Sequence, residues 1–470
     1  MNKEKIDLKL LPTGLSDFDN TILEGGFPRY SLNIICGPPG SGKTIFTYQM
    51  LFANVSTKNK AVCFTTISEP PIKVLRYLQQ LDFFDAARLK KYIKLVDIGM
   101  MLREASYVGG MMEAIDFIRE QVEKKDASLV VIDSFKALTS LLDNPKAMRK
   151  FIYDLAAELT ALSCTTFLVG EYAEEEIISD PVFAIADGII ILSADRKGYL
   201  RRSYLEILKM RGTGYFAGRH RFGISPSGIT VYPRLKPKEL PVPEKAEERS
   251  RIRTGIVGLD KMTGGGLYKA SATLVSGPSG IGKTILSLQF LKEGARDGQK
   301  GLFVSFEESP GRLFSLSATC GIELDRLVKE KKIILYHISP VELCVDSFHR
   351  QIISLIEKER PERVVIDSIA DISITIADPT NLKNYLLSLV SKFYELGVTS
   401  ILTSELAKDE FPITSTRLSV VIDTIILLRY KEEEERMKRK ISVLKMRGSD
   451  HAKEIREFEI TNKGMKINES

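Results

Sequence analysis

The sequence predicts an α/β protein of two consecutive domains of the same kind, each with a mostly parallel central sheet flanked by helices. Three observations support this fold class. The two halves of the chain repeat the same blocks of sequence in the same order. Each half has a glycine-rich loop between an apolar strand and a helix, and each has a second apolar strand that ends in an aspartate. Strands that alternate with helices are typical of parallel sheets.

The internal repeat is visible in four blocks. The first half contains "TGLSDFDNTILEGGFPRYSLNIICGPPGSGKT", and the second contains "TGIVGLDKMTGGGLYKASATLVSGPSGIGKT". A helix-like stretch with a shared glutamine, Gln49 or Gln289, follows each block. Further along, "SLVVIDSFKAL" corresponds to "RVVIDSIADI", and "LEILKMRGTG" corresponds to "ISVLKMRGSD". A repeat that spans the chain indicates a duplicated structural unit.

Chain length fits two domains, because 470 residues is about twice the length of a common α/β domain. We expect domain 1 over residues 1–237 and domain 2 over residues 238–470. Near the boundary, the stretch 234–251 is rich in proline and charge, which disfavours helix and strand. We interpret it as the linker between the domains.

The composition indicates a soluble, cytoplasmic protein. No apolar run approaches the roughly 20 residues that span a bilayer, and "MNKEKIDLKL" is too charged for a signal peptide. The formal charge of +6 comes from basic and acidic residues that are mixed along the chain, which gives no sign of nucleic-acid binding. The five cysteines suit neither a disulfide framework nor a metal cluster, so we interpret them as buried thiols. They are Cys36, Cys63, Cys164, Cys320 and Cys344.

The glycine-rich loops, "GPPGSGKT" at 37–44 and "GPSGIGKT" at 277–284, are the strongest chemical signal. The backbone N–H groups of such a loop can surround phosphates, its lysine reaches the β- and γ-phosphates, and its threonine hydroxyl binds Mg²⁺. A glycine turn that only looks like a phosphate loop is the alternative, and the repetition argues against it. We therefore expect ATP and Mg²⁺ as cofactors. The predicted nucleotide-binding residues are Gly37, Gly40, Ser41, Gly42, Lys43, Thr44, Gly277, Gly280, Ile281, Gly282, Lys283 and Thr284.

The apolar strands "LVVID" and "VVID" end in Asp133 and Asp367. A carboxylate at the carboxyl edge of a parallel sheet can hold the Mg²⁺ of a bound nucleotide. We therefore predict a metal site at Thr44 and Asp133 in the first half, and another at Thr284 and Asp367 in the second. The unbroken apolar runs suit central strands that are buried on both faces. Each half is thus predicted to be a P-loop NTPase core.

The halves differ in the residues that could activate the attacking water. Glu307 and Glu308 follow the strand after the second loop, whereas Ile67 and Ser68 occupy the same positions, counted from the loop lysine, in the first half. A carboxylate at this place suits a catalytic base. Glu69 lies one residue further on, which normally turns a side chain to the other face, although a turn after Glu69 could return it to the site. We predict that domain 2 hydrolyses ATP and that domain 1 binds ATP with weak or no hydrolysis.

These motifs resemble those of the KaiC-like ATPases, the circadian-clock group of the RecA superfamily. The resemblance covers almost the whole chain and rests on the duplicated P-loops, the Glu-Glu pair and the "LKMRG" segments. It is most specific in "VVIDTIILLRY" and "ISVLKMRGSDHAKEIREFEITNKG". It implies two tandem RecA-like P-loop NTPase domains in a double-ring homohexamer, with ATP at the subunit interfaces. It also implies a role in signalling or regulation through protein partners that the sequence does not name.

The resemblance gives the "LKMRG" segments a role, because in the family their lysine and arginine reach the γ-phosphate bound by the neighbouring subunit. Here these residues are Lys209, Arg211, Lys445 and Arg447. His451 matches a further family position at the nucleotide, and Tyr215 replaces it in the first half. A cation supplied in trans can stabilise a transferring phosphate, and Lys-x-Arg on a strand places both cations on one face. A solvated basic face is the alternative.

Two departures from the family pattern affect the expected regulation. The family's phosphate-accepting Ser-Thr pair aligns with Ser419 and Val420, so we expect at most one phosphate acceptor, Ser419, in a serine autokinase reaction. A two-site phosphorylation cycle is therefore not expected. The sequence also ends soon after "ITNKGMKI", so we expect no long tail of the kind that the clock protein uses to engage its activator.

Two other function classes remain open. A RecA/RadA-type DNA-dependent ATPase would share the ATPase core. However, the sequence shows no helical DNA-binding segment before the first core and no basic-aromatic loop suited to strand binding, so we expect no nucleic-acid partner. The other class is a non-catalytic ATP-gated scaffold, which would bind its partners according to the nucleotide state of the ring.

Overall fold

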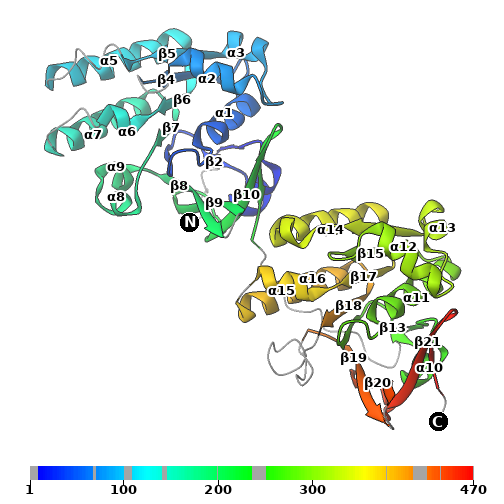
Figure 1. Ribbon diagram of the computed structural model, residues 1–470. Coiled ribbons are helices and arrows are strands. Elements are labelled where there is room, and N and C mark those ends of the chain that lie inside the picture. The colour runs from blue at the N-terminus through cyan, green and yellow to red at the C-terminus, as the bar shows by residue number, and fades with distance from the viewer. Residues whose placement is uncertain are drawn as a thin grey trace, which may run out of the picture. The chain divides into compact units, whose positions relative to one another are not determined.

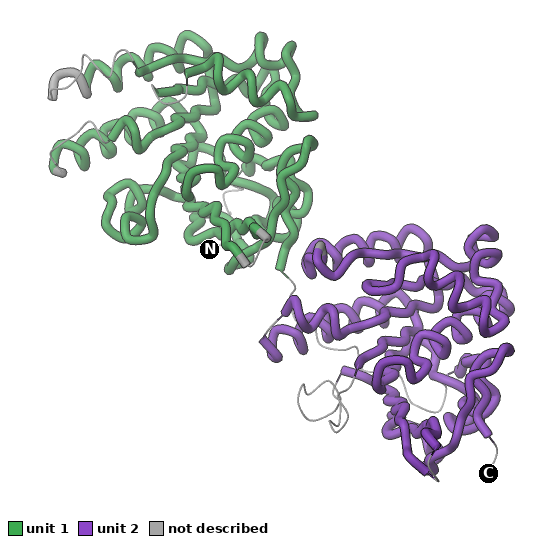
Figure 2. Tube along the Cα trace, in the orientation of Figure 1, with its two compact units in different colours: residues 1–234 green, residues 235–470 purple. Residues whose placement is uncertain are grey.

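Two compact α/β units, residues 1–234 and residues 235–470, make up the protein (Figure 2). The computed structural model describes residues 9–66, 70–99, 108–139, 145–197, 200–234, 250–376, 378–405, 421–433 and 436–468. In each unit a central sheet carries helices on both of its faces (Figure 1).

The sheet of the first unit has nine strands in the order β11-β10-β9-β8-β3-β7-β6-β4-β5. The strands from β8 to β5 in this order are parallel, and β9, β10 and β11 extend the sheet in antiparallel fashion. The bounds are β3 (Leu32–Cys36), β4 (Lys60–Thr65), β5 (Ile93–Asp97), β6 (Ala127–Asp133), β7 (Thr165–Gly170), β8 (Gly188–Lys197), β9 (Leu200–Met210), β10 (Arg219–Ser225) and β11 (Gly228–Tyr232). A separate short pair comprises β1 (Leu10–Leu11) and β2 (Phe27–Pro28).

The sheet of the second unit repeats this topology. Read from the edge that corresponds to β11, its order is β22-β21-β20-β19-β14-β18-β17-β15-β16. The bounds are β14 (Ala272–Gly277), β15 (Gly301–Ser305), β16 (Ile333–His337), β17 (Arg363–Asp367), β18 (Thr399–Glu405), β19 (Thr424–Glu433), β20 (Arg436–Met446), β21 (Arg456–Thr461) and β22 (Gly464–Ile467). The short pair is β12 (Arg251–Ile252) and β13 (Leu267–Tyr268). Because order and direction match strand by strand, the sequence repeat is also a structural repeat, and the predicted fold class is confirmed.

Most of the helices connect parallel strands, whereas η1 and α10 lie between the strands of the short antiparallel pairs. Those of the first unit are η1 (Phe18–Ile22), α1 (Lys43–Asn54), α2 (Pro71–Leu78), α3 (Ala86–Tyr92), α5 (Val108–Lys125), α6 (Phe135–Thr139), α7 (Pro145–Ala161), α8 (Glu174–Ser179) and α9 (Pro181–Ile185). Those of the second unit are α10 (Val257–Met262), α11 (Lys283–Arg296), α12 (Pro310–Thr319), α13 (Leu324–Lys329), η3 (Pro340–Glu342), α14 (Val345–Glu359), α15 (Ile369–Thr375) and α16 (Pro379–Glu395). Among the described residues, no helix is both long and apolar enough to cross a bilayer.

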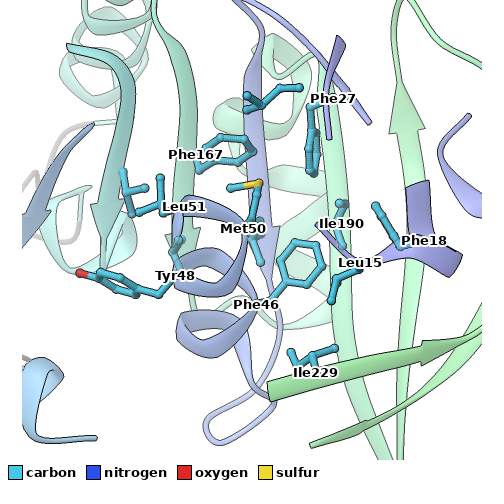
Figure 3. Close-up of a cluster of buried hydrophobic side chains, with 14 of the residues drawn as sticks. Leu15, Phe18, Phe27, Phe46, Tyr48, Met50, Leu51, Phe167, Ile190 and Ile229 are labelled. Atoms are coloured by element: carbon cyan, nitrogen blue, oxygen red, sulfur yellow. The ribbon is translucent and has the colours of Figure 1, made fainter. Parts of the chain in front are cut away.

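The central parallel strands are buried on both faces, as their unbroken apolar sequences predict. Alternate residues of β3 enter opposite cores: Ile35 joins the cluster that contains α1, and Ile34 joins the cluster on the other face. In the first cluster Phe46 and Met50 of α1 lie among side chains of β7 and β8 (Figure 3). This packing fixes α1, and with it the loop that precedes α1, against the centre of the sheet.

The cysteines are free thiols in the described structure. Cys36, Cys63, Cys164 and Cys320 are buried, which confirms the interpretation from sequence, and Cys344 is half-buried. Burial raises the pKa of Cys36 and of Cys63 to about 12. These thiols are therefore protonated at neutral pH and serve as small apolar side chains of the core.

The glutamine shared by the two halves ties the helix after the glycine-rich loop to the outer hairpin of each sheet. In the first unit, Gln49 Oε1 accepts a hydrogen bond from the backbone N–H of Ile229 in β11 at 2.7 Å. In the second unit, Gln289 Oε1 accepts one from the backbone N–H of Met465 in β22, also at 2.7 Å. The helix that carries the loop is thereby connected to the edge of the sheet by a polar contact in addition to its apolar packing.

We predict that Gln49→Ala and Gln289→Ala each destabilise their own unit. An unpaired backbone N–H costs about 1–3 kcal/mol, which lowers Tm by about 2–12 °C for a unit of this size. Differential scanning calorimetry of the full chain measures the effect. The exposed Gln80 offers a matched control, and Gln80→Ala should leave Tm almost unchanged. An unchanged Tm in both test variants would contradict the structural role of the glutamines.

Candidate nucleotide sites

Each glycine-rich loop lies at the carboxyl end of the central strand of its sheet, β3 or β14, and leads into α1 or α11. The last glycine of each loop, Gly42 or Gly282, has φ of 96° or 119°, a region that favours glycine. A Cβ at Gly37 would lie 1.9 Å from the carbonyl oxygen of Leu192 in β8. The loop therefore needs glycine both for its conformation and for its close approach to the neighbouring strand.

The lysine of each loop is hydrogen-bonded to the loop itself. The Nζ of Lys43 donates to the carbonyls of Gly37 and Pro38 at 3.0 and 2.9 Å, and that of Lys283 donates to those of Gly277 and Pro278 at 2.8 and 2.9 Å. The ammonium group in each unit is therefore held inside the curve of its loop.

The hydroxyl of Thr44 donates to Asp133 Oδ2 at 3.0 Å, and that of Thr284 donates to Asp367 Oδ2 at 2.8 Å. A hydroxyl and a carboxylate side by side are the oxygen ligands that Mg²⁺ uses together with nucleotide phosphates. The described residues contain no group of three or more His, Cys, Asp or Glu side chains that could hold a metal by themselves. The donor set thus fits a Mg²⁺ that arrives with a nucleotide.

Other loop residues contribute through their backbone. The side chains of Ser41 and Ile281 are buried in the protein, so only their main-chain groups can reach a ligand. Gly40 and Gly280 both have positive φ, and the carbonyl oxygen of each accepts a hydrogen bond from a side chain of another strand. Arg201 of β9 donates to Gly40 O at 3.0 Å, and the Tyr430 hydroxyl of β19 donates to Gly280 O at 3.1 Å.

The cavity of the second unit, of about 330 Å³, is strongly acidic. Glu307 and Glu308, the predicted catalytic carboxylates, line it together with Asp367 and Glu405. Burial raises the pKa of Glu307, and the charges of Asp371, Glu405 and Asp367 raise it further. A carboxylate with a raised pKa is a better proton acceptor than an ordinary one, so Glu307 is well placed to act as a base.

The same carboxylates act on the loop lysine of the second unit. Burial lowers the pKa of Lys283, and the negative charges of Glu405, Asp367 and Glu307 partly offset this effect. These charges favour the ammonium form of Lys283 before any phosphate is bound.

The cavity of the first unit, of about 770 Å³, has different walls. Its polar part includes Lys43, Asp133, Lys136 and Glu171. Its apolar part is formed by Val74, Tyr77, Leu78, Leu81 and Ile224. The residues aligned with the catalytic glutamates, Ile67 and Ser68, lie outside the described residues, as does Glu69.

Sequence reasoning missed one acidic position in each unit. Glu171 directly follows β7, and Glu405 ends β18, so both lie at the carboxyl edge of the strand beside the loop strand. Glu171 Oε1 is 3.7 Å from Lys43 Nζ. The aligned stretches "TTFLVGE" and "TSILTSE" would have indicated these residues, since each is an apolar strand followed by an acid at a ligand-binding edge.

The "LKMRG" cations of the first unit lie at the opposite edge of the sheet from their own loop. Met210 of β9 pairs with Gly188 of β8, and Gly188 pairs with Asn33 near the start of β3, whereas the loop follows the end of β3. The Nζ of Lys209 donates to the carbonyls of α9, at 3.2 Å for Ala184. Its pKa is lowered by burial and by the charge of Arg211.

The second unit repeats this arrangement. Lys445 of β20 donates to the carbonyl of Ile422, just before β19, at 2.8 Å. Burial, together with the charge of Arg447, lowers the pKa of Lys445 to about 8. His451 follows β20 at the same edge, with Nδ1 3.4 Å from Ser449 O. Within one unit, neither these cations nor Lys209 and Arg211 are brought to the loop of that unit.

Ser419, the predicted phosphate acceptor, lies outside the described residues, so the structure does not place it.

The two domains, each with a phosphate loop and a threonine–aspartate pair at the end of a mostly parallel sheet, define a tandem P-loop ATPase of the RecA type. A family model described as "ATPase: KaiC" matches residues 11–236 and again residues 252–470. The chain belongs to this KaiC family of ATPases.

Curated relatives cover nearly the whole chain. The circadian clock protein KaiC3 of Synechocystis sp. is 32% identical over 99% of this chain and 93% of its own length. The circadian clock oscillator protein KaiC of Thermostichus vulcanus is 30% identical over 99% of this chain and 90% of its own length. That of Synechococcus elongatus is 29% identical over 100% of this chain and 91% of its own length.

We predict that Lys43→Ala and Lys283→Ala each reduce the bound nucleotide from two molecules to one per chain, because each lysine serves only its own loop. Nucleotide content after gel filtration in ATP and Mg²⁺ measures this, and the double variant should bind none. Lys60→Ala is a suitable control, because Lys60 is paired with the exposed Asp126 at 3.0 Å. Undiminished binding by Lys283→Ala would contradict the second site.

Proposed function

We propose that the protein works as a ring-forming regulatory ATPase in which the first domain retains ATP and the second hydrolyses it. The observation that carries this proposal is the contrast between the two cavities. The second collects Glu307, Glu308, Asp367 and Glu405 around its loop, with the pKa of Glu307 raised. The described wall of the first cavity is partly apolar and includes a second lysine, Lys136. We therefore assign ATP hydrolysis to the second site and ATP retention to the first, on the same scaffold.

In the second site each residue has a separate task. Lys283 and the loop amides bind the phosphates, and Thr284 and Asp367 would hold Mg²⁺, which supplies charge neutralisation at the phosphates when bound. Glu307 orients the attacking water and takes its proton. Glu308, whose carboxylate is 3.9 Å from Arg312, helps to shape the acidic wall.

The position of the "LKMRG" cations supports assembly into a homohexamer with nucleotide between subunits. A loop and its own Lys-x-Arg lie at opposite edges of one sheet, so a second copy of the chain must provide the cations for a shared triphosphate. Lys209, Arg211, Lys445, Arg447 and His451 are the proposed contributors. Association brings phosphate charge to Lys445 and so favours its protonated form.

Transfer of phosphate to Ser419 is a subsidiary part of the proposal and rests on the family resemblance alone. Mass spectrometry after incubation with ATP tests it, and absence of phosphate on Ser419 would leave a plain ATPase. A non-catalytic scaffold would instead bind partners with no dependence on turnover in the second site.

We predict that Glu307→Gln lowers ATP turnover by about 10²- to 10⁴-fold, the usual contribution of a catalytic base. Glu308→Gln should have a smaller effect, and Glu69→Gln should hardly change the rate. Since the pKa of Glu307 is raised, activity should be lost on acidification at a higher pH than for an ordinary carboxylate. Phosphate release at saturating ATP measures these rates. Loss of activity through Glu69 rather than Glu307 would reverse the assignment of the two domains.

We predict that the protein is a hexamer in ATP and that Arg211→Ala weakens the ring, because Arg211 supplies charge to the nucleotide of the neighbouring first domain. Light scattering measures the mass in ATP, in ADP and without nucleotide. A monomer at saturating ATP in the unmodified protein would refute sharing of the sites between subunits.

A further inference from the structure

Lys136 is a second cation in the first nucleotide cavity, and neither the loop motif nor the metal pair accounts for it. Helix α6 begins two residues after Asp133, at the end of β6, so Lys136 lines the same cavity as Lys43. In the second unit the corresponding residue, counted from Asp367, is Ala370. The additional lysine is therefore a property of the first site alone.

The Lys136 ammonium has two neighbours in the described structure. It forms an ion pair with Oε1 of Glu176 in α8, and it lies over the ring of Tyr172, 4.8 Å from the ring centroid. The side chain of Lys136 is 31% exposed and that of Glu176 is 43% exposed. The other carboxylate oxygen of Glu176 accepts a hydrogen bond from the backbone N–H of Ala173 at 2.8 Å. Glu176 thus has a backbone partner that does not depend on Lys136.

A terminal phosphate would compete well for this ammonium. Lys43 inside the loop brings the phosphates of a nucleotide into the cavity that Lys136 lines. A terminal phosphate carries up to two charges and three strong acceptor oxygens, whereas Glu176 offers one charge in contact with water. Surface ion pairs of this kind contribute little, so giving up the Glu176 contact costs little.

We propose that Lys136 binds the terminal phosphate of a nucleoside triphosphate in the first site, exchanging its ion pair with Glu176 for one with that phosphate. This inference rests on the proposed function, in which the first site retains ATP. With a nucleoside diphosphate Lys136 keeps its contact with Glu176. The first site therefore distinguishes triphosphate from diphosphate by charge, without hydrolysis.

The exchange has a consequence for the segment that follows β7. Tyr172, under Lys136, packs edge-on against Phe183 of α9 with ring centroids 5.0 Å apart. The carbonyl oxygens of Phe183 and Ala184 accept hydrogen bonds from Lys209 at 3.5 and 3.2 Å. Breaking the Lys136–Glu176 ion pair therefore affects α8 and α9. The carbonyl oxygens of α9 bind Lys209, which is proposed to serve the neighbouring subunit.

The test uses the full chain with Lys283→Ala, which leaves the first site as the only P-loop site with its lysine. Equilibrium dialysis in Mg²⁺ gives Kd for ATP and for ADP. Adding Lys136→Ala should weaken ATP binding by about tenfold or more, as expected for a hydrogen bond to a charged group, and ADP binding by much less. Lys136→Arg should retain most of the ATP preference.

Glu176→Gln provides the matched variant, because it removes the competing anion. It should tighten ATP binding a few-fold, and the double variant Lys136→Ala with Glu176→Gln should still lack the preference for ATP over ADP. Equal weakening of ATP and ADP by Lys136→Ala, or no weakening of either, would overturn the inference while leaving the proposed function intact. Failure of the Lys283→Ala parent to bind ATP would instead overturn the proposed function of the first site.

Discussion

A hydrogen bond between a loop threonine and an aspartate on a nearby strand is the contact on which each nucleotide site depends. Thr44 lies in α1, which follows β3, and Asp133 ends β6, with β7 between β3 and β6 in the sheet. In the second unit Thr284 follows β14 and Asp367 ends β17, with β18 between these two strands. The contact forms only if these parallel strands end in register. Burial of the strands on both faces provides that register, and the glycines allow the loop to turn back over the strand ends. The packing of the core strands therefore also determines the geometry of the nucleotide site.

Both units have this threonine–aspartate contact, but they differ in the residues that line the cavity around it. In the second unit burial raises the pKa of Glu307 and the surrounding carboxylates raise it further, which favours proton abstraction from water. In the first unit Lys136 adds positive charge beside Lys43, which favours retention of a polyphosphate. Only a few side chains separate the two kinds of site, because the backbone that positions the phosphates is the same. The proposed division of roles would give a duplicated ATPase a reason to keep both loops.

Residues that act within one short motif were accessible from the sequence. The loops, the strand-ending aspartates and the repeat fix the fold class, because each motif is a run of neighbouring residues with a local conformational requirement. Glu171 and Glu405 were missed, since a single acid after a strand is not distinctive until the strand is known to lie beside the loop. Lys136 was missed because a single lysine after a strand is equally undistinctive until the cavity that it lines is known. The separation of Lys209 from its own loop also became evident only from strand pairing.

Whether a complete site requires two subunits is tested most directly by mixing two inactive proteins. Lys283→Ala disables the second loop but keeps Lys445 and Arg447, and a Lys445→Ala, Arg447→Ala double variant keeps the loop but lacks the cations. Both keep an unchanged first domain, which is proposed to hold the ring together. Each alone should hydrolyse almost no ATP, and rings assembled from the mixture should recover activity at interfaces that pair an intact loop with intact cations. A mixture that stays inactive, or full activity in the double variant alone, would contradict sites shared between subunits.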